Sequence, residues 1–157
     1  MGYGRTRLTA ILLIASLSLA AGDQPVKVAP GDKCPVCGMF VAKYPDFVAQ
    51  VIFKDGSYAV FDGVKDMMKY YFNFPKYNPA KTASDISRIW VTDYYALELI
   101  DGVEAFYVIG SNVYGPMGHE LIPFKDEAGA QEFLKDHQGK SQVRFNRITP
   151  EIVAGLD

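Results

Sequence analysis

Residues 48–74 of the chain read VAQVIFKDGSYAVFDGVKDMMKYYFNF, and they contain the clearest secondary-structure signals in the sequence. Val48–Phe53 and Tyr58–Phe61 are rich in β-branched and aromatic residues, and the Lys54-Asp55-Gly56 sequence between them is typical of a tight hairpin turn. Asp62 is expected to cap the helix that follows. Apolar residues recur behind it at the i, i+3, i+4 and i+7 spacing of an amphipathic helix, at Met67, Tyr70, Tyr71 and Phe74. Two strands followed by a helix are therefore predicted here.

A third strand at residues 88–95 (RIWVTDYY) completes a ββαβ unit, and the same order of elements then repeats. Strands are predicted at residues 105–109 and 120–124, a helix from about 126 to 137, and a closing strand at 142–146. The second helix has the same apolar spacing, at Ala130, Phe133, Leu134 and His137. We therefore predict an α+β fold made of two tandem ββαβ units packed into one small domain.

The boundaries of this domain follow from the composition on either side. Residues 23–33 contain two prolines and a glycine and are interpreted as a linker. The domain is expected over residues 34–147, with units at about 34–95 and 96–147, and residues 148–157 are assigned to a C-terminal tail. The first hairpin of the second unit has a longer loop than that of the first unit.

The N-terminal residues 1–22 have the pattern of an export signal. Arg5 and Arg7 precede an apolar run, Leu8–Leu19, and small residues follow at positions 20–22. The run is shorter than the about 20 residues that a membrane span needs, so a membrane tether is expected only if this segment stays uncleaved. A cysteine for lipid attachment is absent from the region of the expected cleavage, so the sequence predicts a periplasmic protein that is not a lipoprotein.

The charge of the chain argues against nucleic acid or an anionic membrane as a partner. The net charge is −2, and it becomes −4 when Arg5 and Arg7 are lost with the signal segment. Such a protein lacks the basic surface that these partners require.

The only two cysteines, Cys34 and Cys37, are spaced as C-x-x-C. A disulfide between them would close so small a loop that it would restrain the unfolded chain little. Reactivity or metal binding is therefore a better explanation for this pair than structural cross-linking.

Two short segments place soft donors on either side of a glycine: Cys37-Gly38-Met39 and Met117-Gly118-His119. If each backbone is extended, residues i and i+2 point to the same side, so both donors of a segment could face one ion. Thiolate, thioether and imidazole are the ligands that Cu(I) prefers. We therefore predict a Cu(I) site built from Cys37, Met117 and His119, with Met39 and Cys34 as further ligands. No catalytic dyad or triad is evident, so an enzyme is not expected.

Three other interpretations remain open at this stage. The cysteine pair is also the motif of thiol–disulfide oxidoreductases, although only a short linker-like stretch precedes it. Both cysteines and both histidines, His119 and His137, could hold a structural zinc ion, although the histidines are too far apart for a finger-type pair. A periplasmic interaction module without copper is the third. Met67 and Met68 are interpreted as core residues, and His137 as a residue near a helix C-terminus.

Several motifs together resemble the NosL family of nitrous-oxide reductase accessory proteins. They are Cys34-Pro-Val-Cys-Gly-Met-Phe40, Phe61-Asp-Gly63 followed by Met67-Met-Lys-Tyr-Tyr71, and Gly115-Pro-Met-Gly-His-Glu-Leu-Ile-Pro-Phe124. The resemblance covers roughly residues 33–147. It implies an exported chaperone of two ββαβ units that holds Cu(I) and passes it to a copper-delivery machinery and to an apo-cuproenzyme, nitrous-oxide reductase. Its copper ligands would fall on Cys37, Met39 and the loop from Met117 to His119. Family members are typically lipoproteins and do not require Cys34, and this chain departs from them in both respects.

Overall fold

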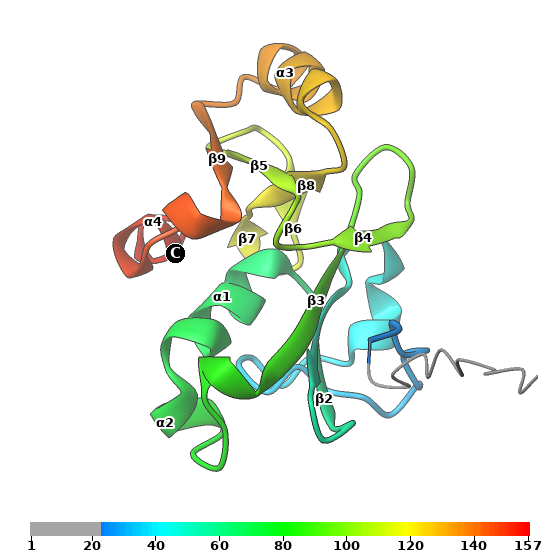
Figure 1. The fold of residues 1–157 in the computed structure, drawn as a ribbon. Coiled ribbons are helices and arrows are strands. Elements are labelled where there is room, and N and C mark those ends of the chain that lie inside the picture. Colours follow the sequence, from blue (N-terminus) through cyan, green and yellow to red (C-terminus); the bar gives the residue numbers. More distant parts are fainter. Residues whose placement is uncertain (1–22) are drawn as a thin grey trace, which may run out of the picture.

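The structure is a computed structural model that describes residues 23–157, which form two antiparallel sheets, a small hairpin and flanking helices (Figure 1). The export signal predicted at residues 1–22 lies outside the described residues. Among residues 23–157, every helix is too short or too polar to cross a bilayer.

The first unit forms a four-stranded sheet in the order β2-β1-β3-β4. Its elements are β1 (Ala49–Phe53), β2 (Tyr58–Phe61), α1 (Val64–Phe72), α2 (Phe74–Tyr77), β3 (Ile86–Thr92) and β4 (Leu99–Asp101). Because β1 lies between β2 and β3, the chain passes through the two helices to reach the other side of β1. The hairpin turn is as predicted, with Gly56 at a φ of 84° that glycine adopts without strain.

The second unit repeats this topology with three strands in the order β8-β5-β9. Its elements are β5 (Phe106–Ile109), β8 (Ile122–Phe124), α3 (Glu127–Asp136) and β9 (Ser141–Arg144). In both units the first strand is central, the second lies on one side and the third on the other. The prediction of two tandem ββαβ units is therefore confirmed.

Two predicted elements end earlier than expected, for identifiable reasons. The third strand stops at Thr92, because Tyr94 and Tyr95 leave the sheet and pack their rings against Phe124 and Phe133 of the second unit. The first helix stops at Phe72 because Asn73 has φ −140° and ψ 57°, and α2 begins after it.

The two ends of the described chain pack on the domain. Residues 23–33 were interpreted as a linker. Within them, the backbone N–H and carbonyl of Val26 each form a hydrogen bond of 2.8 Å with the buried side chain of Gln50. The segment 148–157, assigned to a tail, contains α4 (Pro150–Ala154), which packs against α1. Val153 and Leu156 are buried in the main core. Both ends therefore contribute to the domain.

Candidate metal centre

The two cysteines lie in a loop, residues 33–40, that is closed by backbone hydrogen bonds. The Cys34 N–H donates to the Met39 carbonyl over 2.9 Å, and the Gly38 N–H donates to the Cys34 carbonyl over 2.9 Å. Gly38 has a φ of 79°, in the left-handed region that disfavours side chains. Cys34 is buried, whereas Cys37 and Met39 are half-buried. The fold therefore holds the cysteines in a small loop closed by backbone hydrogen bonds.

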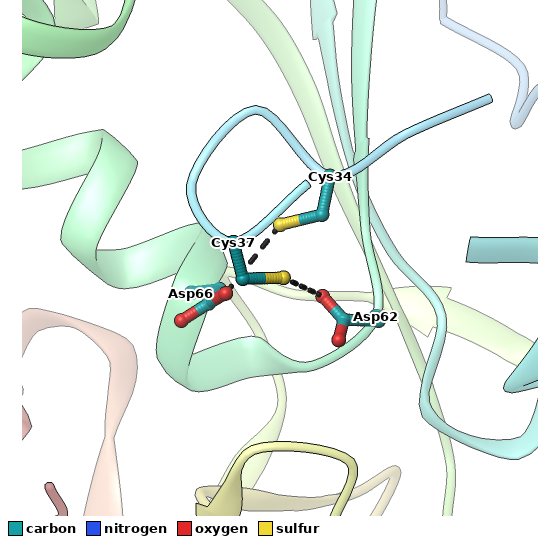
Figure 2. Close-up of side chains that lie close together, drawn as sticks. All are labelled: Cys34, Cys37, Asp62 and Asp66. Atoms are coloured by element: carbon teal, nitrogen blue, oxygen red, sulfur yellow. Dashed lines mark hydrogen bonds between the residues drawn. The ribbon is translucent and has the colours of Figure 1, made fainter. Parts of the chain in front are cut away.

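Each thiol faces a buried carboxylate of the segment that starts α1 (Figure 2). Cys37 Sγ lies 3.2 Å from Asp62 Oδ1, and Cys34 Sγ lies 3.5 Å from Asp66 Oδ2. The four groups, which we call the cysteine–aspartate cluster, offer ligand atoms that all lie within 4.8 Å of one another. Asp62 is only 1% exposed, and its Oδ2 atom is buried with no hydrogen-bond partner.

Both thiols are protonated at neutral pH in the metal-free protein. Burial raises the pKa of Cys37 to about 11, and burial also raises the pKa of Cys34. Each thiol can therefore donate a hydrogen bond to its carboxylate. A thiol–disulfide oxidoreductase needs the opposite, a thiol whose pKa is lowered so that the thiolate attacks. The raised pKa of each thiol is thus unfavourable for the oxidoreductase interpretation.

Asp62 does not cap α1, contrary to the prediction from sequence. The N-cap residue is Gly63, which has no side chain to offer as a cap. The Asp62 side chain is turned towards Cys37 instead. The Lys65 N–H of the first turn donates instead to Glu120 Oε1, over 2.5 Å. Burial raises the pKa of Glu120 to about 8, against the opposing effect of the Leu121 and Lys65 N–H groups.

The segment with the second predicted ligand pair forms a two-stranded hairpin, β6 (Tyr114–Gly115) and β7 (Gly118–His119). Met117, 44% exposed, lies in its turn, and the exposed His119 ring lies 4.7 Å from the Tyr114 ring. Gly118 has a φ of 91°. The condition that both ligand segments be regularly extended is therefore not met at their central glycines, since Gly38 and Gly118 both have positive φ values.

The first turn of α1 contacts both predicted ligand segments, and β7 lies beside it (Figure 1). Asp62 and Asp66 face the cysteines, as described above. On the hairpin side, Lys65 Nζ donates to the Met117 carbonyl over 2.7 Å. Gly63 approaches Glu120 so closely that a Cβ on it would lie 2.2 Å from Oε2. The structure therefore anchors the cysteine loop and the hairpin to one helical turn, while within residues 23–157 neither histidine belongs to the cysteine–aspartate cluster.

His137 is used elsewhere in the fold. It is the C-cap residue of α3, its ring stacks on Phe133 with centroids 4.4 Å apart, and its Nδ1 lies 3.3 Å from the Asn112 side-chain oxygen. A zinc site made of both cysteines and both histidines is therefore not assembled among the described residues.

We expect Gly63→Ala to lower the free energy of unfolding by about 1–3 kcal/mol, because the added methyl group must displace a buried Glu120 carboxylate held by two backbone N–H groups. Gly31→Ala is the matched control, since a Cβ there meets nothing within 4 Å. Urea denaturation of both variants measures the difference. Equal unfolding midpoints for the two variants would contradict this account of the α1–Glu120 contact.

Comparison with known proteins identifies the family. The sequence pattern of NosL matches residues 25–153. The chain belongs to the NosL family. A curated relative from Stutzerimonas stutzeri, the copper-binding lipoprotein NosL, is 28% identical over 133 residues. That alignment covers 80% of this chain and 66% of the relative, so the chain spans slightly less than two thirds of the relative's length.

A solved NosL structure has the same fold. The crystal structure of the copper chaperone NosL from Shewanella denitrificans superposes with a TM-score of 0.70 at 22% identity, and it covers 82% of this chain and 98% of its own. At this identity the likeness concerns the architecture, and it agrees with the pair of ββαβ units described above.

The cysteine pair was evident from the sequence, whereas the carboxylates beside it were not. Asp62 and Asp66 are four residues apart where the helix was expected to begin, which was the available signal, but α1 starts only at Val64 and Asp62 precedes it. Which segment that face would meet depends on contacts between residues 25 and 32 positions apart. Glu120 reaches Lys65 from 55 positions away and gave no comparable signal.

Proposed function

We propose that this NosL-family protein is an exported chaperone that binds Cu(I) and passes it to a protein partner. The observation that carries the proposal is that one short segment at the start of α1, Asp62–Asp66, contacts both the cysteine loop and the methionine–histidine hairpin. The segments that contact the start of α1 together contain two thiols, two thioethers and an imidazole. This set of donors is the one that Cu(I) prefers over harder ions.

The exposure of the proposed ligands suggests how the ion would be held and released. Cys37 and the buried Cys34 would bind as thiolates, with Met39 next to them at the end of the loop. Met117 and His119 are exposed on the hairpin, where ligands of a partner can replace them one at a time. Stepwise exchange of this kind transfers the ion without turnover of a substrate.

The destination of the copper is proposed from the family. The motifs shared with the NosL family favour delivery of the copper to a machinery that matures nitrous-oxide reductase. The relative from Stutzerimonas stutzeri is named a lipoprotein, which favours export for this chain as well. A lipid anchor is part of that relative's name, whereas we predicted none for this chain. The signal segment concerned, residues 1–22, lies outside the described residues.

We expect His119→Ala to weaken Cu(I) binding by about tenfold or more, because it removes an imidazole ligand of the ion. The other histidine supplies a matched control: His137→Ala removes a ring that packs on Phe133 and should leave Cu(I) affinity unchanged. Competition with a chromophoric Cu(I) chelator, on reduced protein without oxygen, measures both affinities. Equal affinities in the two variants would remove His119 from the ligand set.

The same titration with Met117→Leu tests the thioether. Leucine keeps the apolar volume and removes the sulfur, and Met67→Leu, at a buried core position, is the control. A one-to-one Cu(I) complex weakened only by the change at Met117 supports the chaperone. Absence of Cu(I) binding by the reduced protein would favour the interaction module instead.

A further inference from the structure

The cysteine–aspartate cluster contains two ligands that the Cu(I) proposal does not use. Asp62 and Asp66 are buried, and each directs a carboxylate oxygen at one of the cysteines. Carboxylate oxygens are hard donors and bind soft Cu(I) poorly. Burying two carboxylates beside two thiols is therefore unexplained by copper binding alone.

One atom of the cluster is left without a partner. Asp62 Oδ1 accepts from Cys37, but Asp62 Oδ2 is buried with no hydrogen-bond partner. A buried carboxylate oxygen without a partner is costly, because the water it has lost is not replaced. A cation held by this carboxylate and by the neighbouring donors would compensate that loss.

The charge of the cluster favours a divalent ion. With both cysteines bound as thiolates, the four groups carry four negative charges. Compensation is limited: Lys69 Nζ lies 4.0 Å from Asp66 Oδ1 but pairs more closely with Asp157, over 2.5 Å, and Asp66 lies in the first turn of α1, at its positive end. A monovalent ion on the two sulfurs would leave a negative complex facing two carboxylates. A divalent ion neutralises the thiolates and is attracted by both carboxylates.

We infer that Cys34, Cys37, Asp62 and Asp66 form a four-coordinate site for a divalent cation of intermediate softness, for which Zn²⁺ fits best. Zn²⁺ accepts thiolate and carboxylate ligands together and prefers the tetrahedral arrangement that four donors provide. The ligand atoms already lie within 4.8 Å of one another. The site shares its two sulfurs with the proposed Cu(I) site, so the two ions exclude each other, and it needs neither Met117 nor His119.

Co²⁺ is the probe for the first experiment, because tetrahedral Co²⁺ bound by thiolates has intense visible bands and octahedral Co²⁺ does not. Adding Co²⁺ to the reduced protein is expected to produce these bands at one equivalent, and Zn²⁺ is expected to abolish them. Zn²⁺ should also weaken the apparent affinity for Cu(I). A weak octahedral spectrum without thiolate charge transfer would overturn the inference.

Variants separate this site from the copper site. Asp62→Asn and Asp66→Asn are each expected to lower Zn²⁺ affinity by more than about 100-fold. Removing a group that only supports a ligand costs up to about 100-fold, and a direct ligand should cost more. Asp136→Asn, at an exposed position in α3, is the matched control and should have no effect. His119→Ala should also leave Zn²⁺ affinity unchanged, and a loss in that variant would assign the site to a different ligand set.

X-ray absorption on the zinc-loaded wild-type protein keeps the test independent of whether the variants fold. Two sulfurs near about 2.3 Å and two oxygens near about 2.0–2.2 Å are expected. An imidazole in the shell would overturn the inference. The two hypotheses can be rejected separately. If the protein binds Cu(I) but not Zn²⁺, only the divalent site is rejected. If it binds Zn²⁺ but not Cu(I), only the chaperone function is rejected.

Discussion

Cu(I) affinity is expected to rise about 100-fold for each unit of pH between 7 and 9, because two thiols must lose their protons when the ion binds. Burial raises the pKa of Cys37 to about 11 and raises that of Cys34 as well, so both thiols stay protonated in the metal-free protein over this whole range. The bound state therefore holds fewer protons than the free state. Affinity increases as the pH rises and decreases as it falls.

The slope of Cu(I) affinity against pH gives the number of thiols that lose a proton on binding. Two coordinating thiols that release their protons to solvent give a change of about 100-fold per pH unit, and one gives about tenfold. Cys34→Ser should therefore reduce the slope to the value for one thiol if both cysteines bind copper. The measurement is chelator competition at several pH values, with the chelator calibrated alone at each. An affinity that stayed constant from pH 9 to 7 would be incompatible with thiolate ligands.

Local sequence patterns predicted the fold well. The hairpin at residues 48–61 and the helix after it were predicted from alternation, a turn sequence and helical spacing, all of which act over a few residues. The repeat of the ββαβ order was visible for the same reason. The ends of elements were less predictable, since Tyr94 and Tyr95 leave their strand for contacts with the second unit.

The candidate site was predictable only in part, because its geometry depends on contacts between distant segments. Cys34 and Cys37 were found from their chemistry and spacing. The regular extended backbone on which the expected ligand geometry depended is interrupted at Gly38 and Gly118, which adopt positive φ values. Both segments contact the start of α1, where Asp62 accepts a hydrogen bond from Cys37 instead of capping the helix as predicted.

Cys37→Ser is expected to lower Cu(I) affinity by more than about 100-fold while leaving the fold intact. The serine hydroxyl can still donate to Asp62 Oδ1, which accepts from Cys37 in the wild-type protein. The buried packing around Cys34 is not changed. What is lost is the thiolate, the strongest ligand for Cu(I) in the proposed set, and oxygen does not replace it. Thermal unfolding of the variant, compared with the wild type, shows whether the fold is retained.

Oxidation supplies the same test without a mutation. Cys34 and Cys37 are both free thiols, and a disulfide between them would remove both thiolates at once. We expect Cu(I) binding by the wild-type protein to be lost on oxidation and restored by a reductant, with free-thiol titration confirming the redox state. Cys37→Ser cannot form this bond, so its residual affinity should not respond to the same treatment. Tight Cu(I) binding by the oxidised protein would place the ion on methionine and histidine alone and would remove the cysteine loop from the copper site.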